Sequence, residues 1–227
     1  MRSLRRNQLA WLSETGWAAI LARPWDPQAR DCLVHWAKHA LPLVVTRQPD
    51  EAAANGWLAL GLPAPARWGW RRLALQVSLS RVLRHGEFPD LVELQASLPP
   101  SACPTVRLLM AAFEACQAAP RVFGSHGWQA ITGLDHVRPG SDLDLVVAVE
   151  GAAHADDVAQ ALQSFEAPEF RLDGELVFSD GAAVAWREWI EWRAGRVRTV
   201  MVKRLRGVEL QRDAAWCERA EPMELSA

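Results

Sequence analysis

The segment that most constrains this chain is Gly140-Ser-Asp-Leu-Asp-Leu145, which leads directly into the apolar run Val146–Val149. Such a run predicts a buried β-strand, and the side chains of a strand alternate between its two faces. Asp142 and Asp144 are therefore expected on one face, with the two leucines on the other. Carboxylates held this close raise each other's pKa. A hard divalent cation, Mg²⁺ or Mn²⁺, removes that penalty because it prefers oxygen ligands.

A second feature, Phe123-Gly-Ser125, lies upstream of this strand, with residues 126–141 in between. It follows a short apolar stretch, and its small residues predict a corner where the chain changes direction. The sequence after the corner is compatible with a helix over residues 126–131. The expected order is therefore a strand, a small-residue corner, a helix and a strand that carries two aspartates.

This order resembles the DNA polymerase β-type nucleotidyltransferase superfamily. The resemblance implies that Gly124 and Ser125 bind the triphosphate of a substrate, through backbone amides and a hydroxyl. It implies that Asp142 and Asp144 are catalytic and bind the metal. A surface strand with two solvated aspartates after an ordinary turn is the alternative interpretation of the same residues.

A third carboxylate completes the metal site in that superfamily. Asp173 and Glu175 lie two residues apart in the predicted strand 170–178, so both belong to one face of it. The run Arg171-Leu-Asp173 looks most like the third-carboxylate strand of the superfamily. Asp173 is therefore the preferred third catalytic and metal-binding residue, and Glu175 is kept as a further metal ligand.

Positive charge is concentrated in residues 186–212, where eight Arg and Lys against three Glu give +5, although the whole chain carries −2. Arg and Lys suit phosphate groups, and such a segment is either a phosphate or acidic-partner surface or a solvated face. Arg198 and Lys203 are the residues of this segment chosen as ligands of the triphosphate.

Composition narrows the class of protein further. The chain has 227 residues, half of them hydrophobic, and a pI near 6.3. That pI argues against a nucleic-acid binder, which is usually basic. The four cysteines are far apart in the sequence, which indicates reduced thiols rather than a zinc site or a disulfide framework. Polar residues interrupt any signal-like start, and no apolar run reaches membrane length. We expect a cytoplasmic protein without a membrane partner.

Turn residues divide the chain in two. Residues 1–85 predict a small α+β module, in which Asp26 and Pro27 begin a helix that ends near Ala40. Residues 84–89 are the expected boundary. Residues 86–227 predict a polymerase β-like nucleotidyltransferase domain with a mixed sheet and flanking helices, including strands over 184–192 and 197–202.

A narrower resemblance covers residues 5–210. Three motifs carry it: Phe123-Gly-Ser with Trp128-Gln-Ala, Gly140-Ser-Asp-Leu-Asp-Leu, and Asp173-Gly-Glu-Leu-Val-Phe followed by Val184-Ala-Trp-Arg-Glu188. The N-terminal segment Leu60-Gly-Leu-Pro63 is similar as well. They resemble the malonate decarboxylase holo-acyl-carrier-protein synthases, or phosphoribosyl-dephospho-CoA transferases. The resemblance implies transfer from 2'-(5''-triphosphoribosyl)-3'-dephospho-CoA to a serine of the malonate decarboxylase acyl-carrier subunit, with loss of pyrophosphate.

Two other functions are compatible with the same residues. An adenylyltransferase would use ATP and the same metal site on a small molecule or a protein. A non-catalytic domain would bind nucleotide without turnover, although the intact Asp142 and Asp144 argue against it.

Overall fold

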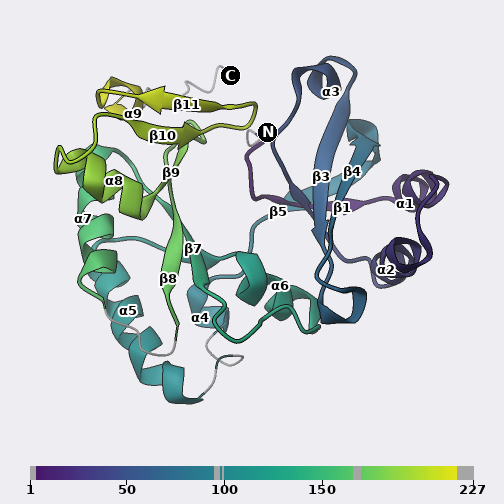
Figure 1. Ribbon diagram of the computed structural model, residues 1–227, viewed down its shortest axis with the longest axis horizontal. Coiled ribbons are helices and arrows are strands. Elements are labelled where there is room, and N and C mark those ends of the chain that lie inside the picture. The colour runs from purple at the N-terminus through teal and green to yellow at the C-terminus, as the bar shows by residue number, and fades with distance from the viewer. Residues whose placement is uncertain (1–3, 95–97, 99, 166–169, 219–227) are drawn as a thin grey trace, which may run out of the picture. The chain divides into compact units, whose positions relative to one another are not determined.

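The computed structural model of the protein describes residues 4–94, 98, 100–165 and 170–218 (Figure 1). Its helices and strands form two compact units. The first falls within residues 1–89, 122–141 and 204–207, and the second within 90–121, 142–203 and 208–227. One antiparallel and one mixed sheet, each with helices, confirm the expected α+β class. The contiguous division into 1–85 and 86–227 stays a prediction.

The first unit is built around a five-stranded sheet of order β4-β3-β2-β1-β5, antiparallel at every pairing. Its elements are, in chain order, β1 (Leu9–Leu12), α1 (Glu14–Leu21), α2 (Pro27–Lys38), β2 (Leu43–Val45), α3 (Asp50–Ala54), β3 (Trp57–Pro63), η1 (Ala66–Trp68), β4 (Arg72–Ser78), η2 (Leu79–Arg81), β5 (Val82–Gly86) and α6 (Gly124–Thr132).

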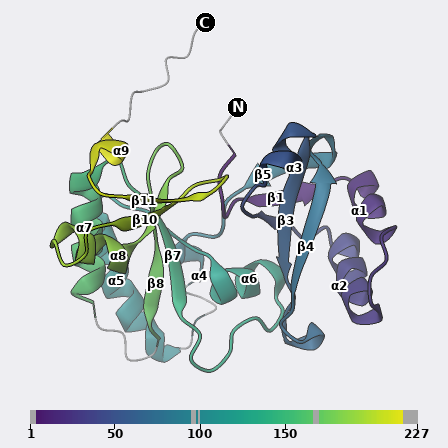
Figure 2. The same cartoon turned by 45° about the horizontal axis from the view of Figure 1, so that its top comes forward.

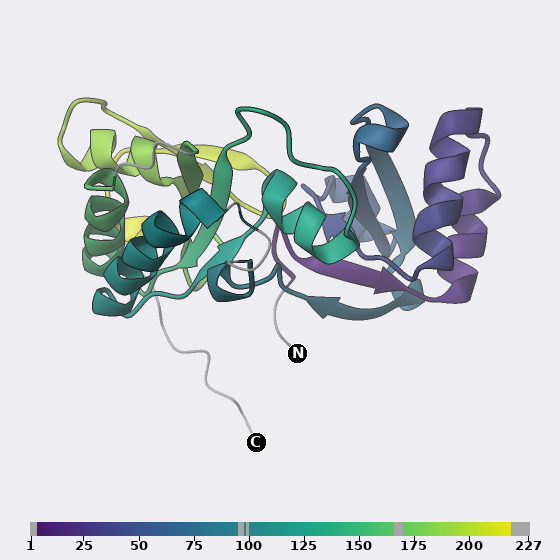
Figure 3. The ribbon, with the colours of Figure 1, turned by 90° about the horizontal axis from the view of Figure 1, so that it is seen from below.

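Helices cover both faces of this sheet. On one face, Leu12 of β1 belongs to the same buried cluster as Ile20 of α1 and Trp36 of α2. Leu9 lies on the opposite face of β1 and packs in a second cluster with Trp128 of α6. Figure 3 shows α1 and α2 side by side along the sheet. The strand alternation of β1 thus anchors α1 and α2 through one set of side chains and α6 through the other.

The start of α2 confirms one local prediction. The Asp26 side chain accepts a hydrogen bond from the Ala29 amide at 2.9 Å, and Pro27 occupies the first helical turn. A carboxylate at this position satisfies an amide that the helix itself leaves without a partner. The helix ends at Lys38, two residues before the end expected at Ala40.

The expected boundary at residues 84–89 is partly a strand. Residues up to Gly86 form β5, which pairs with β1 at the edge of the sheet. A side chain at Gly86 would overlap the Trp11 ring, so glycine allows the indole to lie against the backbone. Gly86, which had indicated a domain boundary, is therefore explained by its close packing against Trp11.

The second unit contains a six-stranded mixed sheet of order β11-β10-β9-β8-β7-β6, in which β7 and β8 are parallel (Figure 2). The neighbouring pairs from β8 to β11 are antiparallel. Its elements are α4 (Leu91–Leu94), η4 (Pro100–Ala102), α5 (Cys103–Ala115), β6 (Pro120–Val122), β7 (Leu143–Ala148), α7 (Ala152–Gln163), β8 (Leu172–Val177), β9 (Ala183–Ala185), α8 (Trp186–Arg193), β10 (Val200–Lys203), β11 (Val208–Gln211) and α9 (Ala215–Glu218).

The prediction of a strand over 184–192 is wrong beyond Ala185, because the chain enters helix α8 at Trp186. Trp186, Trp189 and Trp192 are buried at intervals of three residues, which places them on one helical face. The alternation of apolar and polar residues over 184–192 had indicated a strand instead of this helical spacing. The later prediction, 197–202, corresponds to β10 at Val200–Lys203.

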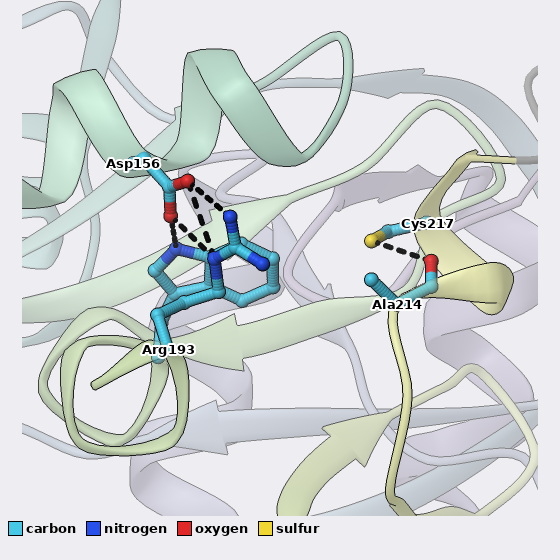
Figure 4. Close-up of polar contacts among 5 residues, drawn as sticks. Asp156, Arg193, Ala214 and Cys217 are labelled. Carbon is cyan, nitrogen blue, oxygen red and sulfur yellow. Dashed lines mark hydrogen bonds and ion pairs between the residues drawn. The ribbon is translucent and has the colours of Figure 1, made fainter. Parts of the chain in front are cut away.

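Charged side chains join α8 to α7 (Figure 4). Asp156 accepts hydrogen bonds from the Arg193 guanidinium at 2.6 Å and from the Trp189 indole at 2.8 Å. The Cys217 thiol donates to the Ala214 carbonyl oxygen, and the four cysteines, all within the described residues, are not joined in disulfides. Within the described part of the chain, every helix is too short or too polar to traverse a lipid bilayer.

Candidate active site

The aspartates of the central segment lie as alternation predicts. Asp142 directly precedes β7 and Asp144 is half-buried on it, whereas Leu143 and Leu145 are buried on the other face. In the parallel register between β7 and β8, Asp144 stands opposite Asp173. The structure therefore brings Asp142, Asp144 and Asp173 to the same part of one sheet.

This pairing requires a glycine beside Asp173. Gly174 has φ +149°, and a side chain there would overlap the Leu145 carbonyl on the neighbouring strand. The two central strands can approach this closely only because Gly174 lacks a side chain. Gly174 therefore lies within β8 and not in a turn.

Negative charge accumulates around Asp144. The pKa of Asp144 is raised to about 6, first by burial and then by the charges of Asp173, Asp142 and Glu175, with Arg171 offsetting part of the rise. Burial and the neighbouring negative charges both disfavour the ionised carboxylate. A cation at this face would therefore find carboxylates whose mutual repulsion it relieves.

Arg171 is the cation of this face that the sequence did not assign. Its guanidinium lies 3.4 Å from an Asp173 oxygen and 3.9 Å from an Asp142 oxygen. Its side chain is 59% exposed, so the two ion pairs are screened by water and contribute little to stability. The sequence could have indicated the contact with Asp173, because residues two positions apart in an extended segment point to the same face.

Two predicted site residues are paired with each other. The Lys203 ammonium on β10 lies 2.6 Å from a carboxylate oxygen of Glu175 on β8, and Glu175 is 8% exposed. The sequence had assigned Lys203 to the triphosphate and Glu175 to the metal. The ion pair now gives Glu175 a local partner, which makes Asp173 the better third carboxylate.

The carboxylates of this face have the chemistry of a metal site. Their oxygen ligands fit Mg²⁺ in chemical character. However, no group of three His, Cys, Asp or Glu side chains among the described residues stands in position to hold an ion together. The carboxylate oxygens are therefore the kind of ligand that Mg²⁺ prefers, but Asp142, Asp144 and Asp173 would have to move closer together to bind one ion jointly.

The Gly-Ser corner belongs to the first unit. Gly124 has the left-handed φ of +62° and begins α6, so the predicted helix starts two residues earlier than expected, at the corner itself. Among the described residues no side chain caps this helix start, and its first amides, including that of Ser125, have no intrahelical acceptor. Amides in this position suit an anionic group, which agrees with the predicted role of the corner.

Several basic side chains of residues 186–212 are engaged within the second unit. Arg193 pairs with Asp156, and Arg196 pairs with Glu191 at 2.6 Å. Arg187 donates to the Leu172 carbonyl at 2.9 Å. Arg198 is exposed between α8 and β10, at the opposite end of β10 from Lys203. The structure does not bring these two predicted triphosphate ligands together, and their roles stay predictions.

Comparison with known proteins supplies the family. Residues 5–88 match the N-terminal domain, and residues 90–214 the C-terminal domain, of "Phosphoribosyl-dephospho-CoA transferase MdcG". A protein named phosphoribosyl-dephospho-CoA transferase from Xanthomonas euvesicatoria is 36% identical over 200 residues, which is 87% of this chain and 89% of that protein. Proteins of the same name from Bradyrhizobium diazoefficiens and Pseudomonas aeruginosa are 36% and 33% identical, over 81% and 69% of this chain and 80% and 72% of their own lengths.

No solved structure matches the chain at a significant level. The α+β fold, the aspartates on adjacent parallel strands and these relatives define the class of protein, a transferase. Both domain matches lie end to end along most of the chain. The chain belongs to the phosphoribosyl-dephospho-CoA transferase (MdcG) family, as its motifs had indicated.

Proposed function

We propose that this protein transfers the phosphoribosyl-dephospho-CoA group from 2'-(5''-triphosphoribosyl)-3'-dephospho-CoA to a serine of the malonate decarboxylase acyl-carrier subunit. The serine hydroxyl attacks the α-phosphorus. A phosphodiester bond forms, the bond to the departing pyrophosphate breaks, and the hydroxyl proton is released. The observation that carries the proposal is the register that sets Asp144 opposite Asp173, with Asp142 beside them, in a member of this family.

Asp142, Asp144 and Asp173 are the proposed ligands of Mg²⁺ or Mn²⁺. Bound there, such an ion supplies Lewis-acid stabilisation of the charge that develops on the phosphates. The role of the carboxylates is to hold that positive charge at one place on the sheet. Burial and the repulsion between the carboxylates together raise the pKa of Asp144, and a bound cation would remove the repulsion.

Other residues of the chain are proposed to orient the donor. The amides of Gly124 and Ser125 at the start of α6, and the Ser125 hydroxyl, bind the triphosphate. Arg171 pairs with the two aspartates only through exposed contacts, so little energy is lost when its guanidinium turns to a phosphate oxygen. The protein needs no nucleophile of its own, because the acceptor brings the attacking hydroxyl.

Mass spectrometry of the acyl-carrier subunit tests this proposal. The subunit is incubated with the protein, Mg²⁺ and the triphosphoribosyl donor, and in parallel with ATP in place of the donor. Addition of the whole prosthetic group from the donor, and no addition from ATP, is the expected result. Addition of an adenylyl group from ATP, or no modification by either donor, would contradict the proposal.

The cytoplasmic location of the protein stays a prediction.

A further inference from the structure

An exposed tryptophan in the first unit has an unusual backbone conformation. Trp70 has the left-handed φ of +52°, and 43% of its surface is exposed. A bulky residue rarely adopts this conformation, which costs about 1–3 kcal/mol and persists where the surroundings impose it. The large ring is therefore held at the surface at a cost, instead of being buried where it would contribute to stability.

The loop around Trp70 is held by its own hydrogen bonds. The Ala64 amide donates to the Arg71 carbonyl at 2.7 Å and closes the loop, and the Trp70 amide donates to the Pro65 carbonyl at 3.2 Å. The neighbouring indole of Trp68 is buried and donates to an Asp31 carboxylate oxygen at 2.7 Å. These contacts fix the position from which the Trp70 ring projects.

A second loop places an arginine on that ring. The guanidinium carbon of Arg138 lies 4.1 Å from the centroid of the Trp70 ring. The Ala66 amide donates to the Asp135 carbonyl and joins the two loops, and the Arg138 amide donates to the Ser141 hydroxyl at 2.9 Å. The pair therefore combines two planar groups and one positive charge at the surface of a constrained loop.

We propose that Trp70 and Arg138 form the surface that binds the adenine nucleotide portion of the donor, with the purine stacked on the pair and the nearby phosphate beside the guanidinium. This inference rests on the proposed function, which supplies a dephospho-CoA ligand. Stacking on an aromatic ring suits a purine, because the base has a polarisable face, and arginine adds a cation–π contact. Arg138 lies four residues before Asp142 in the sequence.

The chain contains a matched control for this test. Trp57, the first residue of β3, has the same 43% exposure, and no stacked guanidinium covers it in the described part of the chain. Calorimetric titration with 3'-dephospho-CoA compares wild type, Trp70→Ala and Trp57→Ala. We expect Trp70→Ala to weaken binding about 5- to 150-fold, the loss of one base–aromatic stack. Trp57→Ala should bind as wild type does.

Further titrations separate stacking from charge and from folding. Arg138→Gln keeps the ring and removes the charge, so it should also weaken dephospho-CoA binding, and it replaces Trp70→Ala if that variant fails to fold. Arg84→Gln is its control, because Arg84 also stacks on an indole, that of Trp11 at 3.4 Å. Inorganic tripolyphosphate, which has no base, should bind Trp70→Ala and wild type equally.

Equal dephospho-CoA affinity for wild type, Trp70→Ala and Arg138→Gln would overturn the inference, as would an equal loss in Trp57→Ala. A failure of the proposed function gives a different result. Wild type would then bind dephospho-CoA through Trp70 but leave the carrier unmodified. The Asp144→Asn variant adds a second check, because we expect it to bind dephospho-CoA as wild type does while transfer is lost.

Discussion

Protonation of one buried histidine should make the protein unstable in mild acid. His136 is 5% exposed between the rings of Trp36 and Trp128, and its Nε2 has no hydrogen-bond partner among the described residues. Burial lowers the pKa of His136 to about 4 from an ordinary 6.5, and the neighbouring Asp135 offsets only part of this effect. The perturbation to make is His136→Gln, which removes the titrating group.

The size of the effect follows from these pKa values. Between pH 6.5 and about 4 the unfolded chain binds a proton at His136 that the folded protein does not bind, so stability falls as the pH falls through this window. Linkage gives a loss of about 2 kcal/mol from this residue between pH 7 and pH 5. The contribution is fully present above pH 6.5.

Urea unfolding at pH 7 and pH 5 measures this loss. His136→Gln lowers stability at pH 7 through altered packing, but it should lose about 2 kcal/mol less than wild type between the two pH values. His39→Gln, a change at an exposed histidine, is the control and should follow wild type. If His136→Gln and wild type lose the same stability on acidification, the histidine is not held neutral by burial.

Three further predictions concern the second unit and the Gly-Ser corner. Gly174→Ala should destabilise the protein by about 2 kcal/mol or more in urea unfolding, because the new side chain overlaps the adjacent strand, whereas Gly207→Ala, with open space around it, should stay within about 0.5 kcal/mol. Lys203→Met should destabilise by about 3 kcal/mol by leaving the buried Glu175 charge without its lysine, and adding Glu175→Gln should restore part of that loss; a neutral single change would contradict the pairing. Ser125→Ala should slow transfer about 10- to 100-fold, less than either aspartate change, because its hydroxyl is one donor among several amides; complete loss in steady-state assays would assign it a larger role.

The parts of the fold that depend on neighbouring residues could be predicted from the sequence. The opposite faces of Asp144 and Leu145 follow from strand alternation, and the start of α2 follows from Asp26 and Pro27. The α8 helix was missed because Trp186, Ile190 and Trp192 lie an even number of residues apart, a spacing that a short strand also shows. Local periodicity cannot distinguish strand from helix in so few residues.

The contacts of the site depended on strand register, which is a long-range property. Nothing near Lys203 in the sequence indicates that it reaches Glu175, because the contact requires β9 to lie between their strands. For Arg171 only the second partner depends on register: Asp173 is two residues away in the sequence, whereas Asp142 comes near only when β7 pairs with β8. Residue types indicated the chemistry, and the pairing of the strands decided which charges meet.

The most direct test of the account counts pyrophosphate released against carrier molecules modified. Wild type, Asp142→Asn and Asp144→Asn are incubated with the triphosphoribosyl donor, Mg²⁺ and the acyl-carrier subunit, after circular dichroism has shown that all three are folded. Wild type should release one pyrophosphate for each carrier that gains the prosthetic group, and both variants should release none. Near-wild-type turnover by either folded variant, or pyrophosphate release without carrier modification, would contradict the account.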